Sequence, residues 1–185
     1  MSHIAIVSSS IRTGRQSHRV ALFFKNFLEE NNFASTEILD LLQFNFPLFT
    51  ERLSKKPEPS AGMLDFAEKI KAADGVLIVT PEYNGGYPAS LKNVIDLLLI
   101  EWRRKPVAIS TVSSGTMGGS QVIMSLQFTL WKMQAWTVPA MFTVSNVSET
   151  FDERGIPTDK ATVEKRASKF LDELLWCMEA AKKMM

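Results

Sequence analysis

Short runs of β-branched and other apolar residues alternate along this chain with longer segments in which apolar residues recur every three or four positions. The first run covers residues 4–7, and the segment 20–28 that follows has its apolar residues at helical spacing. Four further runs have the length of strands that are covered on both faces, at 36–39, 76–79, 107–112 and 141–144. Further helices are predicted over 63–72, 88–102, 118–133 and 163–178. Strands that alternate with helices predict an α/β fold with a parallel sheet and right-handed crossovers.

Five parallel strands suit a flavodoxin-like three-layer sandwich with the strand order 2-1-3-4-5. In such a sheet, ligands bind outside the carboxyl ends of the strands, at the switch between strands 1 and 3. This order predicts that the loops 8–17, 81–87 and 113–119 lie on one rim. The stretch 41–60 contains three prolines and has no clear period, so we interpret it as a long connection that could carry function.

Length and composition bound the class of protein. A chain of 185 residues suits one domain, over 1–185, and 45% hydrophobic with 22% charged residues is a globular composition. A net charge of +1 gives no field that would attract nucleic acid or an anionic membrane. One cysteine and two histidines exclude an internal disulfide and a structural zinc site, so we expect no metal and a reduced, cytoplasmic setting. No apolar run is long enough to span a bilayer, and residues 1–7 lead into a strand rather than a signal segment.

The loop after the first strand is rich in hydroxyl groups and leads into a helix, whose first amides have no intrahelical partner. Arg12, Arg15 and Arg19 stand near the positive end of that helix, which costs about 0.3–1 kcal/mol per charge unless an anion binds there. The loop lacks both the Walker and the Rossmann glycine patterns, so a monophosphate is the ligand that fits. The alternative interpretation is a capped helix with solvated arginines.

The loops after the third and fourth strands are rich in glycine. Pro81 ends a strand, and Asn84-Gly85-Gly86 predicts a tight turn with left-handed backbone conformations. Backbone amides in such a turn can approach a planar ring closely, as a flavin requires. The loop 113–119 opens the next helix and could line one face of the ring. Each loop alone could equally be an ordinary turn.

Segment 81–96 resembles the P-E-Y-N-x-x-x-P-G-x-L-K-N-A-I-D motif of the NADPH-dependent FMN reductases, a family that includes quinone, chromate and azo reductases. Segment 9–17 is similar to the G-S-L-R-x-G-S-x-N phosphate loop of that family, and 113–119 is similar to its S-x-G-x-x-G-G loop. The resemblance covers nearly the whole chain, from Ile4 to about Met178. It implies a single flavodoxin-like domain that binds FMN.

Carried over residue by residue, the resemblance implies two sets of FMN contacts. The phosphate set comprises Ser10, Arg12, Gln16 and Ser17, and the isoalloxazine set comprises Pro81, Glu82, Tyr83, Asn84, Gly85, Ser113, Gly115 and Gly118. The chain departs from the pattern at four positions, which are Ser9, Arg15, Ala89 and Leu97. Arg15 replaces a small hydroxyl residue, so we expect it to strengthen phosphate binding or to reach a nicotinamide phosphate. Leu97 stands where an aromatic residue is common in the family, so the resemblance does not determine which surface faces a partner.

The expected function is hydride transfer from NADPH or NADH, through bound FMN, to a small acceptor such as a flavin, a quinone, an azo compound or a metal oxyanion. The resemblance implies a ping-pong order in which donor and acceptor use the same flavin face in turn. No catalytic side chain is expected, because flavin N5 carries the chemistry.

The main alternative is an FMN-binding electron carrier without its own nicotinamide site. Near-neutral charge and Arg12 argue against that alternative, since such carriers are strongly acidic and have hydroxyl-only phosphate loops. A regulatory module that binds another phosphate ranks last.

The predicted helix 88–102 is apolar nearly all round, which is more than one sheet face can cover. A subunit interface would bury the excess, so we expect a homodimer or a homotetramer built from two dimers, with the flavin near the interface. The alternative is that the core of a single chain buries this helix.

Overall fold

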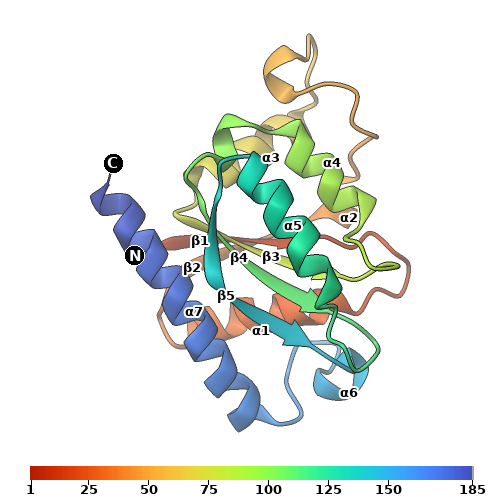
Figure 1. The fold of residues 1–185 in the computed structure, drawn as a ribbon, viewed down its shortest axis with the longest axis vertical. Helices are drawn as coiled ribbons and strands as arrows, with labels where there is room; N and C mark the ends of the chain where they lie inside the picture. The colour runs from red at the N-terminus through yellow and green to blue at the C-terminus, as the bar shows by residue number, and fades with distance from the viewer. Residues whose placement is uncertain (185) are drawn as a thin grey trace.

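The computed structural model describes residues 1–184 and contains a five-stranded, all-parallel sheet (Figure 1). Its strands are β1 (His3–Ser8), β2 (Ser35–Asp40), β3 (Gly75–Pro81), β4 (Pro106–Val112) and β5 (Trp136–Val144). They lie in the order β2-β1-β3-β4-β5, which confirms the predicted flavodoxin-like α/β fold. β5 begins five residues earlier than predicted. The exposed Pro139 interrupts its apolar pattern, and an edge strand tolerates a proline that a central strand would not.

Helices cover both faces of the sheet. They are α1 (Ser17–Glu30), α3 (Ala61–Ala72), α4 (Ala89–Leu97), α5 (Gln121–Lys132) and α7 (Lys160–Lys183), with the single-turn helices α2 (Leu41–Phe44) and α6 (Val147–Thr150) and the 3₁₀ turns η1 (Leu53–Lys55) and η2 (Ile100–Trp102). Figure 1 shows α1 and α7 on one side of the sheet and α3, α4 and α5 on the other. Each side has its own cluster of buried apolar side chains, because side chains of successive strand residues point to opposite faces. Within residues 1–184, no helix is long and apolar enough to cross a membrane.

The prediction of one helix over 88–102 is wrong for its last five residues. α4 ends at Leu97, Leu98 is extended, and a 3₁₀ turn follows. The reason is tertiary: Trp102 is fully buried, and its Nε1 donates a hydrogen bond to the carbonyl oxygen of Ile95 at 3.2 Å. Folding back in this way buries Leu98 as well and leaves Leu99 and Ile100 exposed. Much of the apolar excess on this segment is therefore covered within the chain.

The connection 41–60 is mostly irregular, as predicted, but it is tied to its neighbours. Phe44 and Phe46 pack against Phe66 of α3, with ring centroids 5.3 and 5.6 Å away. Asn93 of α4 donates to the carbonyl oxygen of Pro47 at 2.7 Å and accepts a hydrogen bond from the amide of Phe49. These contacts hold the connection beside α3 and the middle of α4.

Candidate functional site

A cavity of about 320 Å³ lies where the carboxyl ends of β1, β3 and β4 meet the amino end of α1. All three loops predicted on one rim contribute to its lining, which confirms that part of the prediction. The lining residues are Ser10, Arg12, Thr13, Gly14, Arg15, Gln16, Ser17, Pro81, Glu82, Tyr83, Val112, Ser113, Ser114 and Val147.

Contacts with the neighbouring strand and helix determine the shape of the first loop. The amide of Ser9 donates to the carbonyl oxygen of Val79 at 3.1 Å, which continues the ladder between β1 and β3. The hydroxyl of Ser90, in the first turn of α4, donates to the carbonyl oxygen of Ser9 at 2.6 Å. The amide of Arg12 donates to Ser10 Oγ at 3.3 Å. The loop is thus a fixed part of the rim rather than a free connection.

Several polar atoms around the cavity are buried and have no hydrogen-bond partner within residues 1–184. They are Ser9 Oγ, Gln16 Oε1, Ser17 Oγ and Glu82 Oε2. Gln16 is the N-cap residue of α1, yet its side chain caps nothing. A buried polar group without a partner costs about 1–3 kcal/mol, so most such groups in proteins are satisfied. A ligand that carries both hydrogen-bond donors and acceptors would satisfy these atoms.

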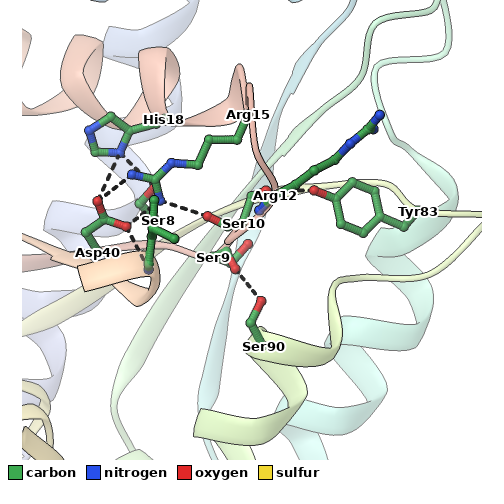
Figure 2. Close-up of polar contacts among 10 residues, drawn as sticks. Ser8, Ser9, Ser10, Arg12, Arg15, His18, Asp40, Tyr83 and Ser90 are labelled. Atoms are coloured by element: carbon green, nitrogen blue, oxygen red, sulfur yellow. Dashed lines mark hydrogen bonds and ion pairs between the residues drawn. The ribbon is translucent and has the colours of Figure 1, made fainter. Parts of the chain in front are cut away.

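The three arginines of this region lie in three different environments. The Arg12 side chain is exposed at the cavity, and no ion pair involves it within the described residues. Arg15 turns away and pairs through both terminal nitrogens with Asp40, and its Nη1 also donates to the carbonyl oxygen of Ser10 at 2.8 Å (Figure 2). Arg19 donates to the carbonyl oxygen of Phe151 at 2.9 Å. Arg12 is therefore the guanidinium that an anion in the cavity can reach without breaking an existing pair.

Sequence reasoning missed Asp40 and His18, which lie on the side of the first loop away from Tyr83 (Figure 2). Burial alone would raise the pKa of Asp40, but hydrogen bonds from Arg15 and from the amide of Leu42 hold this pKa below its usual value. Burial and the charge of Arg15 lower the pKa of His18, against the opposing charge of Asp40. The signal for Asp40 was present in the sequence, because a carboxylate directly follows the predicted strand 36–39 and must reach the same rim.

The second loop forms the predicted tight turn. Asn84 and Gly85 have φ values of +52° and +82°, and the amide and carbonyl groups of Tyr83 bond to those of Gly86 at 2.8 and 3.1 Å. Tyr83 and Ser10 are linked through their hydroxyl oxygens, which lie 2.6 Å apart (Figure 2). Tyr83 thus contacts the first loop, although its expected partner was the isoalloxazine. Asn84 and Gly85 lie beside the cavity lining rather than in it.

The third loop is held against β4 and β5. Thr111 Oγ1 donates to the carbonyl oxygen of Gly118 at 2.7 Å, and a Cβ at Gly118 would lie 3.0 Å from the side chain of Thr143. Of the residues predicted on this loop, Ser113 lines the cavity, whereas Gly115 and Gly118 lie outside its lining. No group of three or more histidine, cysteine, aspartate or glutamate side chains that could hold a metal lies within residues 1–184.

Comparison with known proteins gives a consistent result. Residues 2–149 match the sequence profile of the family described as NADPH-dependent FMN reductase. The chain is 31% identical over 137 residues to an NAD(P)H-dependent FMN reductase of Saccharomyces cerevisiae, which covers 67% of this chain and 71% of that protein. It is 32% identical over 167 residues to a quinone reductase of Pseudomonas putida, which covers 85% of each. Its fold is similar to that of FerB, a flavoenzyme NAD(P)H:(acceptor) oxidoreductase from Paracoccus denitrificans, with a TM-score of 0.79, 23% identity and coverage of 98% and 99%. The chain therefore belongs to the NADPH-dependent FMN reductase family.

Proposed function

We propose that this protein is an oxidoreductase that passes a hydride from NADPH or NADH, through FMN bound in the 320 Å³ cavity, to a small organic acceptor. The observation that carries the proposal lies at the amino end of α1, where two groups line the cavity. The Arg12 guanidinium forms no ion pair within residues 1–184, and the buried Ser17 hydroxyl has no hydrogen-bond partner among them. These are the groups that a terminal phosphate requires.

The phosphate end of FMN would bind at the first loop. Ser17 Oγ can donate to a phosphate oxygen, Arg12 can add a charge-assisted hydrogen bond, and the first amides of α1 present the positive end of the helix dipole. Gln16 Oε1 and Glu82 Oε2 are acceptors, so they suit the hydroxyl groups of a ribityl chain. Ser10 would contribute its hydroxyl, which Tyr83 already contacts.

The isoalloxazine would lie between the second and third loops, against residues 81–85 and the loop that contains Ser113, Gly115 and Gly118. Bound FMN supplies the hydride chemistry, so the chain itself needs no acid, base or nucleophile at the reacting atom. Its own contributions are the placement of the ring and the exclusion of water by the surrounding loops. The turn at 83–86 is suited to this, since Gly85 and Gly86 have no side chain that would keep a ring away from their backbone.

For the acceptor, the similarity to a quinone reductase over 85% of the chain favours a quinone or another flat ring compound such as a flavin or an azo dye. The rival function, an FMN-binding electron carrier without a nicotinamide site, fits less well. A net charge of +1 and a free arginine at the phosphate end distinguish this chain from a strongly acidic carrier. We place the reaction in the cytoplasm, where the single Cys177 would stay reduced.

The experiment that tests the proposed function is anaerobic spectroscopy of the purified protein loaded with FMN. Addition of NADPH or NADH should bleach the flavin absorbance, and a quinone added afterwards should restore it. A flavin that stays oxidised in excess NADPH and NADH would support the electron carrier instead. Failure to bind FMN at all would refute both functions.

We also propose that the protein is a homodimer, or a dimer of dimers, that pairs through α5. This helix exposes Met124, Phe128 and Trp131, which lie three or four residues apart and therefore on one face. The surface adjoins the flavin loops, because the hydroxyl groups of Tyr87 and Thr129 lie 2.8 Å apart. This differs from the interface expected on helix 88–102, whose apolar residues are mostly buried in the chain. A second copy of the chain would cover this apolar face with the same apolar face.

Light scattering at micromolar concentration tests the dimer. Trp131→Glu should shift the mass toward one chain, because a buried unpaired carboxylate opposes association. Trp176→Glu on α7 is the matched control, since the two tryptophans are 65% and 63% exposed and their helices cover opposite faces of the sheet. A monomeric unmodified protein, or an equal effect of both substitutions, would contradict this interface.

A further inference from the structure

We propose that Asp40 is a positioning residue for the phosphate loop: by pairing with Arg15 it holds the backbone of Ser10 in the shape that receives the FMN phosphate, and it keeps Arg15 out of that site. The inference rests on the proposed function, because it presumes that a phosphate binds at the first loop. It changes the expected role of Arg15, which becomes a support of the loop rather than a ligand of the phosphate.

The position of Asp40 follows from the strand pairing. Asp40 is the last residue of β2 and lies opposite Ser8, the last residue of β1, so its side chain reaches the point where the first loop begins. The carboxylate is 3% exposed and the Arg15 side chain 12% exposed. A paired charge at this depth is well shielded from water and keeps one geometry, unlike an exposed ion pair.

Asp40 is fixed from two sides. One carboxylate oxygen accepts a hydrogen bond from the amide of Leu42 at 3.0 Å, as the N-cap of α2. Both oxygens also receive the terminal nitrogens of Arg15 (Figure 2). A planar guanidinium that is held by a fixed carboxylate through two parallel bonds has little freedom to rotate. Asp40 therefore fixes the position of the Arg15 guanidinium relative to β2.

Because its guanidinium is fixed, Arg15 in turn fixes the backbone of the first loop at Ser10. Its Nη1 donates to the carbonyl oxygen of Ser10 at 2.8 Å. The hydroxyl of the same serine accepts from the amide of Arg12 and contacts Tyr83 Oη. Ser10 thus connects the buried pair to the backbone of Arg12 on one side and to the second loop on the other. Loss of the pair would release the Ser10 carbonyl and with it the placement of Arg12.

The pair also sets the charge of the site. The carboxylate of Asp40 offsets the charge of Arg15, so Arg12 supplies the positive charge at the phosphate end of the cavity, while the Glu82 carboxylate lies in the second loop. This explains how the chain tolerates an arginine where its family resemblance leads one to expect a small hydroxyl residue. The carboxylate that pairs with this arginine stands 25 residues downstream, on the neighbouring strand.

The test compares FMN with riboflavin, which has the same ring and no phosphate, by titration of the apoprotein followed by flavin fluorescence. Asp40→Asn should weaken FMN binding by roughly tenfold or more and change riboflavin binding by less than about twofold. The phosphate contacts depend on the shape of the first loop, whereas the turn of the second loop is closed by its own hydrogen bonds between Tyr83 and Gly86. Glu37→Gln is the matched control, since Glu37 lies on the same strand and pairs with Lys69 at 2.7 Å. It should leave the preference for FMN unchanged.

Two further variants extend the test, and the first leaves Asp40 in place in case Asp40→Asn unfolds. Arg15→Lys retains the charge but has one nitrogen in place of a planar fork, so it cannot form two parallel bonds to the carboxylate and should also lose the FMN preference. The double variant Asp40→Asn with Arg15→Gln should lose no more FMN affinity than the more affected of the single variants Asp40→Asn and Arg15→Gln, because the two side chains act as one unit. Additive losses, an equal loss of riboflavin, or unchanged or tighter FMN binding in Asp40→Asn would overturn the inference. If the unmodified protein itself does not prefer FMN to riboflavin, the proposed phosphate site fails instead.

Discussion

Replacement of Arg12 by alanine should weaken FMN binding and leave riboflavin binding nearly unchanged. The side chain lines the cavity, is exposed, and forms no ion pair within residues 1–184. Its amide, which bonds to Ser10 Oγ, is kept in the alanine variant, so the loop should hold its shape. The substitution therefore removes one guanidinium from the phosphate end and little else.

The magnitude follows from the number of contacts and their exposure. A hydrogen bond to a charged group contributes about 1.5–3 kcal/mol. Water screens the exposed guanidinium, so we count one such bond rather than two. At about 1.4 kcal/mol per tenfold change, the expected loss of FMN affinity is roughly 10- to 100-fold. Arg15 should not compensate, because both of its terminal nitrogens are bonded to Asp40.

Calorimetric titration of the apoprotein with FMN and with riboflavin measures both affinities. Arg103→Ala is the matched control, since it removes the same charge from an exposed position before β4, at the amino ends of the strands, whereas the cavity lies at their carboxyl ends. Added salt should reduce the difference in affinity between FMN and riboflavin in the unmodified protein. The same addition of salt should reduce that difference by less in Arg12→Ala. If Arg12→Ala bound FMN as tightly as the control does, the first loop would not be a phosphate site and the reasoning would be refuted.

Three other outcomes are expected. Asn84→Gly keeps the left-handed turn (φ +52°) but removes the side chain, so it should weaken FMN and riboflavin by similar free energies; an effect on FMN alone would assign Asn84 to the phosphate end. Gly155→Ala should lower the free energy of unfolding by at least about 2 kcal/mol in urea titration, because φ is +80° and the new Cβ would lie 2.5 Å from the carbonyl oxygen of Arg19. Gly14→Ala, at φ +68° with open space around the Cβ, should cost less, and equal losses would argue against the clash. Burial and the charge of Arg15 lower the pKa of His18, so the unfolded chain binds a proton there more readily. The free energy of unfolding should therefore be at its full value above pH 6.5 and fall as the pH drops below it, by at most about 1.4 kcal/mol per pH unit from this group. His18→Gln should remove that part of the slope, and identical slopes between pH 7 and 5 would contradict the assignment.

The order of the strands and the location of the site were accessible from the sequence because they depend on local patterns. Buried parallel strands appear as short apolar runs, and their alternation with helical segments leaves few topologies. The turn at 83–86 was equally readable, since Asn84-Gly85-Gly86 permits the positive φ values that the structure contains. The family resemblance added the identity of the ligand, which no periodicity contains.

Contacts between distant segments decided the rest. The apolar pattern over 88–102 predicts a continuous helix, yet α4 ends at Leu97. Trp102 is buried in the core because the chain turns back after that residue. The roles of Arg12, Arg15 and Arg19 could not be separated in the sequence, where all three look alike at the start of one helix. Parallel pairing of β1 with β2 brings Asp40 opposite Ser8, and that carboxylate binds Arg15 and leaves Arg12 free at the cavity. Local residue patterns thus determined which elements form and where they end at the rim. Which charge faces the ligand was decided by the tertiary structure, because an ion pair depends on distance in space and not on distance along the chain.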